Sequence, residues 1–420
     1  MSRWIRLIVL GCLLTACGNG QAADWPMFRG PAGDGRADDA DYPLKWGPEH
    51  NVQWRMELPT PGNSSPIISS GRVFVTTATD GGTRRHLYCL DRNTGKQLWV
   101  RSVDAPAGEA THQTNPYCGS TPLADGKLVI VWHGNAGLHC YDFSGNPVWS
   151  SNVPKCEHIW GYGSSPVLHE GRVFLNAGPG IDSKMIAFEA ATGRVVWSTP
   201  EPGGANDRNG RMVGSWSTPV VTEVDGELQL ICSMPTRVVA YRPGTGDIAW
   251  SVTGLSSPRG DLCYTSPLFA GQIGIALGGY KGPGMGFTLG GSGDVTEANR
   301  LWETPDGQPQ RIGSGVVVGN HFYQANAGPG IIQCLEVRTG QPTWQQRVSG
   351  THWASIVLAS GRLYATNQDG VTRVFEPDPE KFVLLAENDL QEPTNATPAF
   401  SDGQIVLRTD RAVYGLSLKP

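Results

Sequence analysis

The chain has 420 residues, with 55 Gly, 31 Pro and 14 Trp but only 17% charged residues. This composition favours many short strands joined by tight turns, and no long amphipathic helix is evident. The net charge of -5 gives no overall positive charge to attract nucleic acid, so any anion site must be local. A chain of this length usually holds several domains, unless one repeat architecture accounts for all of it.

The first residues are typical of an export signal. Arg3 and Arg6 precede the apolar run LIVLGCLL, which is too short to span a bilayer stably. The next letters, LTAC, resemble a bacterial lipobox, so residues 1–16 are predicted to be a lipoprotein signal peptide that leaves Cys17 as the lipidated first residue. Ordinary cleavage after Ala23 is the alternative. We therefore expect an exported, periplasmic chain that lipid alone anchors to a membrane. The outer membrane is the expected one, and the inner membrane is the alternative.

A repeat begins after this segment. Each unit opens with a Ser/Thr-Pro motif or a weaker copy of it. Two runs of alternating apolar and polar residues follow, joined by a Gly-containing turn. Such units are typical of four-stranded sheets, and eight of them predict an all-β, eight-bladed propeller. The units start at Ser64, Ser120, Ser164, Ser217, Thr265, Gly313, Trp353 and Asn395.

Most units close with a turn and a tryptophan, as in RNTGKQLW, ATGRVVW, GTGDIAW and RTGQPTW. The Gly can take the positive φ of a tight hairpin, and a flat indole can cover the gap to the next blade. Unit seven departs from this pattern and carries EPDPEKFVLLAEN instead. The predicted blade-docking residues are Trp54, Trp99, Trp149, Trp197, Trp250, Trp302 and Trp344.

The two ends of the repeat region complement each other. The last unit ends at Pro420 without a turn and a Trp, whereas Trp54 lies in NVQWRMELP with no unit before it. An open ring would expose a strand edge, so residues 51–59 are predicted to supply the outer strand of the eighth blade. We therefore expect an anchor or extension segment at 17–50, followed by the propeller at 51–420.

The cysteines beyond the export signal fall into two groups. Cys89, Cys140 and Cys334 occupy the same place in three units and are predicted to be buried free thiols. Others lie in predicted loops, where an exported chain permits a disulfide. Cys118 with Cys156 is the pair that would form it, and free thiols are the alternative.

The Thr-Gly and Trp repeats resemble the quinoprotein-like eight-bladed propellers, the superfamily of pyrroloquinoline quinone (PQQ) dehydrogenases and of the outer-membrane β-barrel assembly lipoprotein. The resemblance covers about residues 51–419. Shorter words, DWPMFRGPAGDG, HQTNPYCGSTP, CEHIWGYGSSP and RIGSGVVV, look like an exported PQQ-like family abundant in planctomycete-type bacteria, for which no biochemical function carries over. The resemblance implies a periplasmic binding or scaffold module with an envelope protein as its partner.

The same resemblance implies a second hypothesis, a quinoprotein dehydrogenase that oxidises an alcohol or a sugar. Such enzymes hold PQQ between a Trp and a vicinal disulfide, with Ca²⁺ on carboxylate and amide oxygens. No Cys-Cys pair occurs in this sequence, so neither PQQ nor Ca²⁺ is expected. No catalytic residue or metal ligand is predicted, because no catalytic or metal-binding motif is present.

One set of loop residues indicates a binding site. In a propeller, the loops that enter the innermost strands meet at one end of the central channel, and here they carry Arg, His and aromatic residues. Such groups bind an anionic or sugar-like ligand, whereas the alternative is that they plug the channel and satisfy loop carbonyls. Arg311 needs either Asp261 or an external anion as its partner. The candidate residues of this channel mouth are His112, Asn115, His158, Trp160, Arg208, Arg211, Arg259, Asp261, Arg311, His352 and Trp353, and Tyr117, Tyr162, Trp216 and Asn395 lie in the same loops.

Overall fold

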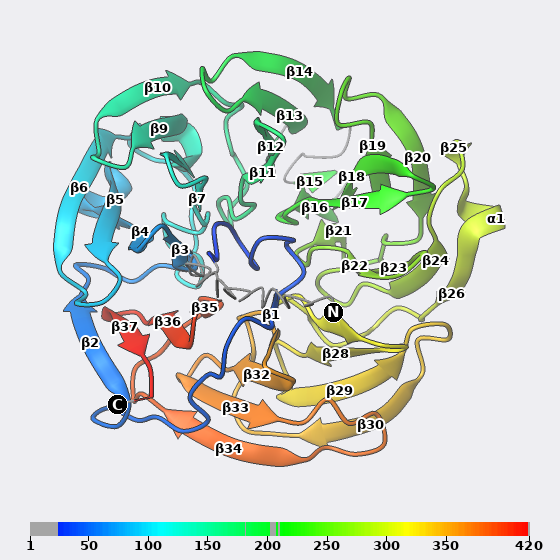
Figure 1. Ribbon diagram of the computed structural model, residues 1–420. Helices are drawn as coiled ribbons and strands as arrows, with labels where there is room; N and C mark the ends of the chain where they lie inside the picture. Colours follow the sequence, from blue (N-terminus) through cyan, green and yellow to red (C-terminus); the bar gives the residue numbers. More distant parts are fainter. Residues whose placement is uncertain (1–23, 181, 202–206, 209–210, 419–420) are drawn as a thin grey trace, which may run out of the picture.

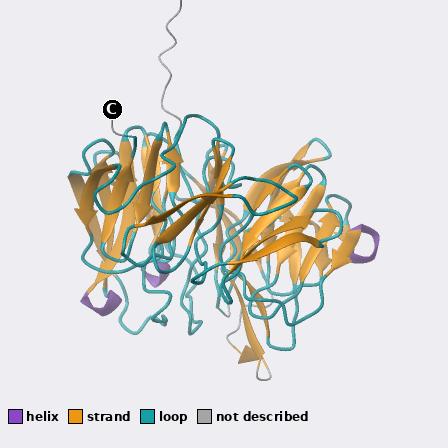
Figure 2. Cartoon of the chain, turned by 90° about the horizontal axis from the view of Figure 1, so that it is seen from below, coloured by secondary structure: helices purple, strands orange, loops and turns teal. Residues whose placement is uncertain are grey.

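The computed structural model describes residues 24–180, 182–201, 207, 208 and 211–418. Eight four-stranded antiparallel sheets surround one axis, which confirms the predicted eight-bladed propeller (Figure 1). Seen from the side, the strands run between the two ends of the ring and the connecting loops gather at both ends (Figure 2). None of the described helices has the length and apolar character needed to cross a membrane.

In blades one to seven the strands follow one another from the axis outward, and the chain starts each of these blades at its inner strand (Figure 1). In blade eight the outer strand, β2, comes from the start of the chain. Blades one to four contain β3 (Ile67–Ser69), β4 (Arg72–Thr79), β5 (Arg84–Asp91), β6 (Gln97–Asp104); β7 (Leu123–Ala124), β8 (Leu128–Trp132), β9 (Leu138–Asp142), β10 (Pro147–Ser151); β11 (Val167–His169), β12 (Arg172–Ala177), β13 (Lys184–Glu189), β14 (Val195–Pro200); and β17 (Val220–Val224), β18 (Glu227–Ser233), β19 (Arg237–Tyr241), β20 (Ile248–Thr253). Blades five to eight contain β22 (Leu268–Ala270), β23 (Ile273–Leu277), β24 (Gly284–Thr288), β26 (Arg300–Glu303); β27 (Val316–Val318), β28 (His321–Ala325), β29 (Ile331–Glu336), β30 (Pro342–Arg347); β31 (Val357–Ala359), β32 (Arg362–Thr366), β33 (Val371–Phe375), β34 (Leu384–Asp389); and β35 (Ala399–Ser401), β36 (Gln404–Arg408), β37 (Ala412–Leu416), β2 (Val52–Glu57).

Several short elements decorate this ring. A three-stranded sheet in the order β15-β16-β21 joins the loops that precede blades four and five, with β16 and β21 parallel. β25 extends blade four and β1 extends blade seven. Their bounds, with those of the short helices, are β1 (Arg36–Ala37), β15 (Asp207–Arg208), β16 (Arg211–Ser215), β21 (Gly260–Cys263), β25 (Gly293–Asp294), η1 (Asp80–Gly82), η2 (Gly134–Ala136) and α1 (Thr296–Asn299).

The ring closes where the two ends of the chain meet. The sequence predicts an outer strand at 51–59, and β2 lies in this range and pairs antiparallel with β37. In that pairing Trp54 lies opposite Gly415. Without β2, β37 would present an open edge to solvent.

A β-bulge precedes the tryptophan in the outer strands. In β6, Leu98 is the extra residue between the paired Gln97 and Trp99. A bulge re-aims the side chains beside it, and Trp99 Nε1 donates to the carbonyl of Phe143 in the next blade at 2.9 Å. Trp250 differs, because its fully buried indole donates to Gln229 Oε1 at 2.7 Å. A bond like that of Trp99, to a carbonyl of the next blade, is made by Trp54, Trp149, Trp197, Trp302 and Trp344.

The glycine of the Thr-Gly turn leaves space for the indole of the preceding blade, and we call this position the glycine seat. Gly246 has a φ of +79°, and a Cβ at this position would lie 2.4 Å from Trp197 of the preceding blade. Gly193 meets Trp149 in the same way. Glycine therefore serves two purposes in the repeat, the left-handed turn and the space for an aromatic ring.

The described cysteines are all free and buried, so the predicted disulfide between Cys118 and Cys156 is wrong. Each thiol meets a different carbonyl, because Cys118 Sγ lies 3.5 Å from Pro61 O and Cys156 Sγ lies 3.6 Å from Gly178 O. The repeated cysteines are small residues that leave room for the indoles. Cys89, Cys140 and Cys334 pair across the sheet with Trp99, Trp149 and Trp344.

Residues 24–42, which we call the strap, cross the axis and pair with the inner strands of blades one and seven (Figure 1). Trp25 pairs with Ile68 in the middle of β3, and β1 pairs in parallel with β31. Arg29 is only 1% exposed and donates to the Gly315 carbonyl of blade six at 2.7 Å. Burial lowers the pKa of this guanidinium to about 10. The strap is thus a built-in part of the propeller.

Candidate functional site

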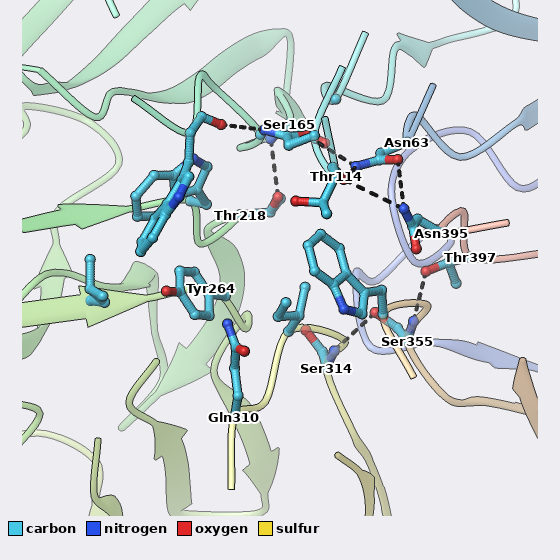
Figure 3. A pocket seen from close by; sticks show the side chains of 18 of the residues that line it. Asn63, Thr114, Ser165, Thr218, Tyr264, Gln310, Ser314, Ser355, Asn395 and Thr397 are labelled. Atoms are coloured by element: carbon cyan, nitrogen blue, oxygen red, sulfur yellow. Dashed lines mark hydrogen bonds between the residues drawn. The ribbon is translucent and has the colours of Figure 1, made fainter. Parts of the chain in front are cut away.

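A ring of hydroxyl groups surrounds the axis where each inner strand begins. In most blades the Ser or Thr precedes a Pro, which favours the extended backbone found there. The N–H of Ser65 donates to Thr121 Oγ1 at 2.9 Å, and the N–H of Thr121 donates to Ser165 Oγ at 3.0 Å. Within the described residues, only the step from Thr218 to Ser266 lacks this bond. The other links are Ser165 to Thr218, Ser266 to Ser314, Ser314 to Ser355, Ser355 to Thr397 and Thr397 to Ser65 (Figure 3).

These links tie neighbouring blades together at the axis, where no strand pairing joins them. The hydroxyl ring was not among the predicted site residues. The recurrence of a hydroxyl side chain at the start of every blade is the sequence signal for it. Its role could not be deduced locally, because the hydroxyls that accept these bonds take them from a neighbouring blade.

The ring encloses a cavity of about 540 Å³. All eight blades contribute to its wall through the loops before their inner strands, and Phe28 of the strap also lines it. We call the end formed by those loops the mouth. Pockets that bury small ligands have volumes of roughly 300–1,000 Å³, so this cavity is large enough to bind one.

The structure separates the predicted mouth residues into three groups. Arg208 and Arg211 belong to β15 and β16, but their side chains lie outside the described part of the chain. Asp261, Arg311, His158 and His352 do not line the cavity. The residues that line it are His112, Asn115, Trp160, Arg259 and Trp353, together with Trp216 and Asn395 from the same loops.

Arg311 does not pair with Asp261, the partner predicted for it within the chain. Its side chain is 4% exposed and donates to the Gly282 carbonyl at 2.8 Å, and no ion pair joins it to Asp261. Asp261 lies on β21, where its backbone pairs with Val213. Burial lowers the pKa of Arg311 to about 10. A backbone carbonyl of blade five therefore takes the place that the sequence assigned to the Asp261 carboxylate.

His158 and His352 are buried behind the mouth and pack against the loops that form it. His158 lies edge-on to Trp216 with ring centroids 4.7 Å apart, and its Nδ1 accepts the Trp160 N–H at 3.2 Å. Burial lowers the pKa of His158 to about 4. Burial, aided by Arg373, lowers the pKa of His352 to about 4 as well. Both rings are therefore neutral at neutral pH.

One side of the mouth is held by a chain of amide side chains (Figure 3). Gln368 Nε2 donates to Asn395 Oδ1 at 2.8 Å, and Asn395 Nδ2 donates to Asn63 Oδ1 at 3.1 Å. Asn63 then donates to Asn115 Oδ1 at 3.1 Å, and Asn115 donates to the Trp160 carbonyl at 2.7 Å. These amides satisfy one another and the loops, as the plug alternative expects.

The other side of the mouth is aromatic. Trp160 and Trp216 have ring centroids 5.9 Å apart, and Trp216 and Tyr264 are 5.4 Å apart. Trp216 Nε1 donates to the Gly161 carbonyl at 2.8 Å, which fixes the centre of this group. We call Trp160, Trp216 and Tyr264 the aromatic wall. These three side chains line the cavity, whereas the amide side of the mouth is already hydrogen-bonded.

A buried ion pair positions the loop that carries His112 and Asn115. Arg85 and Glu109 are 2.9 Å apart, with side chains 0% and 1% exposed. Glu109 Oε2 also accepts the Asn135 N–H at 2.8 Å. Burial raises the pKa of Glu109, although Arg85 opposes that rise. No sequence motif marks this pair, because its members lie in a strand and a distant loop.

The fold and the cavity define an eight-bladed propeller with a ligand-sized axial pocket. A family model described as "Outer membrane protein assembly factor BamB" matches residues 49–117 and 83–346. The chain belongs to this family.

Relatives of two kinds share the repeat. BamB of Burkholderia pseudomallei is 22% identical over 376 residues, which cover 84% of this chain and 83% of that protein. A polyvinylalcohol dehydrogenase of a Pseudomonas species is 22% identical over 237 residues, which cover 48% of this chain but only 36% of the dehydrogenase.

Solved structures show the same fold. BamB from Moraxella catarrhalis has a TM-score of 0.60 at 11% identity, covering 87% of this chain and 96% of that one. A quinohemoprotein alcohol dehydrogenase from Comamonas testosteroni has a TM-score of 0.65 at 13% identity, covering 94% and 80%. At these identities the likeness shows the fold alone.

The lining residues do not fit the PQQ and Ca²⁺ site of the dehydrogenases. Ca²⁺ takes oxygen ligands that usually include carboxylates, and no Asp or Glu lines the cavity. In the described part of the chain, no three His, Cys, Asp or Glu residues are grouped as metal ligands. The sequence also lacks the adjacent cysteines that would flank PQQ.

Proposed function

We propose that this protein is an exported scaffold of the bacterial envelope that takes part in the assembly of outer-membrane proteins. The observation that carries this proposal is the extent of the match to the assembly-factor family. It reaches from residue 49 to residue 346, and the Burkholderia relative is covered over 83% of its length. The dehydrogenase relative is covered over only 36%.

The start of the sequence supports a periplasmic, lipid-anchored location for this scaffold. The letters LTAC place Cys17 where a lipobox cysteine would be acylated. Cys17 lies close in the sequence to Asp24, the first described residue of the strap. An envelope protein is the partner that the proposal requires.

The cavity supports a second element of the proposal, the binding of a small anionic or sugar-like ligand at the mouth. Arg259 and His112 could meet an acid, and the aromatic wall could stack on a ring. A dehydrogenase remains the weaker candidate, because the lining offers no carboxylate for Ca²⁺.

Affinity isolation from solubilised envelope tests the scaffold proposal. The mature chain carrying a C-terminal tag should retain components of the outer-membrane assembly machinery, identified by mass spectrometry. Leu98→Ala, a substitution at an exposed position, should capture the same proteins as the wild-type chain. A preparation that captures no envelope protein, yet reduces a dye with an alcohol or sugar after addition of PQQ and Ca²⁺, would contradict the proposal.

A further inference from the structure

The hydroxyl ring leaves its own protons unused. Every hydroxyl of the ring except that of Ser266 accepts one backbone N–H, as Thr121 does from Ser65, and such a hydroxyl group can still donate its proton. In the described part of the chain, no acceptor is found for the hydroxyl protons of Thr121, Ser165 and Ser355, which line the cavity. A set of free donors therefore surrounds the axis, available to oxygen atoms of a ligand.

The wall of the cavity carries very little charge. Arg259, exposed at the mouth, is the only Arg or Lys among the described lining residues, and no Asp or Glu joins it. Arg311 is withdrawn against the Gly282 carbonyl. Because an unpaired buried charge is costly, the part of a ligand that passes below Arg259 must be uncharged.

The aromatic residues provide the second kind of contact. The aromatic wall lines the cavity from blades three to five, and Trp353 lines it from blade seven. Figure 3 shows Tyr264 and Gln310 on one side of this space and Thr397 with Ser355 on another. A ligand with apolar ring faces and oxygen atoms at its rim matches both the indoles and the hydroxyl donors.

The strap crosses the channel on the side of the cavity opposite the mouth, so it limits which part of such a ligand can enter. Phe28 lines the cavity, and Trp25 and Arg29 fasten the strap to blades one and six. A long polymer therefore cannot thread through the channel, and only its end can reach the hydroxyl ring from the mouth.

We propose that the cavity binds the terminal rings of a neutral oligosaccharide, without catalysis. The ring faces stack on Trp160 and Trp353, and the sugar oxygens accept hydrogen bonds from the hydroxyl ring. This inference rests on the ligand-binding element of the proposed function and is independent of the scaffold role.

A glycan array tests the ligand class directly. The fluorescently labelled mature chain is applied to neutral oligosaccharides and to matched glycans that carry carboxylate or phosphate groups. Binding to neutral glycans is expected. The affinity for the best-bound neutral glycan is then measured by calorimetry, where Trp353→Ala should weaken binding about tenfold or more.

Two further variants separate the cavity from the rest of the surface. Ile312 lines the cavity, so Ile312→Trp should fill it and abolish glycan binding. Leu98→Ala, in the outer strand β6 and away from the cavity, should bind glycan like the wild type. Thermal unfolding confirms that each variant is folded, and Trp353→Leu, which removes the ring face but keeps more of the side-chain volume, replaces Trp353→Ala should that variant not fold.

Several outcomes would overturn the inference. They are binding to no glycan, binding to acidic glycans only, or glycan binding that Ile312→Trp leaves intact. Loss of an envelope partner in Ile312→Trp, without any glycan binding, would instead assign the cavity to protein docking. The affinity isolation reports the scaffold role separately, so failure of one proposal does not imply failure of the other.

Discussion

The backbone N–H of Thr397 donates a hydrogen bond of 3.0 Å to Oγ of Ser65, joining the last blade to the first at the axis. This bond and the pairing of β2 with β37 close the ring at its inner and outer sides. Ser65 and Thr397 are 332 residues apart, so the contact forms only when the whole propeller is assembled.

Substitution of Ser65 by Ala should measure the strength of this closure. The change leaves the buried N–H of Thr397 without an acceptor, which should lower the free energy of unfolding by about 1–3 kcal/mol. Ser256→Ala, at an exposed position, should change it by less than about 0.5 kcal/mol. Equal effects of the two substitutions in chemical denaturation would show that the hydroxyl ring does not stabilise the fold.

The glycine seat of the indole can be separated from the cost of its backbone conformation. Gly246 and Gly71 both have positive φ, +79° and +74°, but only a Cβ at Gly246 would meet an indole. Alanine at Gly71 should cost the left-handed strain alone, whereas alanine at Gly246 should cost about 1–3 kcal/mol more because it displaces Trp197. If the two variants unfold at the same denaturant concentration, the seat is not tightly packed.

Removal of the indole itself should be more damaging. Trp197 is 8% exposed and packs between two blades, so Trp197→Ala should lower the free energy of unfolding by about 3–5 kcal/mol. The far-ultraviolet circular dichroism spectrum should keep its β form, since the other blades retain their contacts. A loss below about 1 kcal/mol would contradict the docking role of this residue.

The buried histidines predict a loss of stability in mild acid. His352 stays neutral in the folded chain down to its lowered pKa of about 4, whereas in the unfolded chain it takes up a proton near pH 6.5. Unfolding therefore binds a proton between these values, and His352 should cost about 2 kcal/mol of stability between pH 7 and pH 5.

The matched variant for this prediction is His352→Gln, because the raised pKa values of buried carboxyls such as Glu109 act in the opposite direction in both proteins. The free energy of unfolding of the wild type should fall by about 2 kcal/mol more than that of the variant over this pH range. Parallel pH profiles would show that His352 is protonated in the folded chain.

The blades were predictable because their signals are local and repeated. The turn glycine and the tryptophan lie within one short word, as in ATGRVVW, and the period of these words defines the number of units. The same words could not reveal that Trp197 donates to Pro243 of the next blade, since this contact depends on how two sheets pack.

The mouth was predictable only in outline. Chain topology indicates which loops approach the axis, and His112, Trp160 and Trp353 do line the cavity there. The direction of each side chain depends on distant groups. Arg311 turns to the Gly282 carbonyl, and the strap residue Arg29 finds its acceptor 286 residues away at Gly315.

The most direct test of the proposed scaffold role is the outer-membrane proteome of a strain from which this chain is deleted. Quantitative mass spectrometry of the outer-membrane fraction should show a broad decrease in several outer-membrane proteins, and the wild-type chain expressed in trans should restore them. Unchanged levels of all outer-membrane proteins, together with the loss of a PQQ-dependent dye-reducing activity, would contradict the account and favour the dehydrogenase.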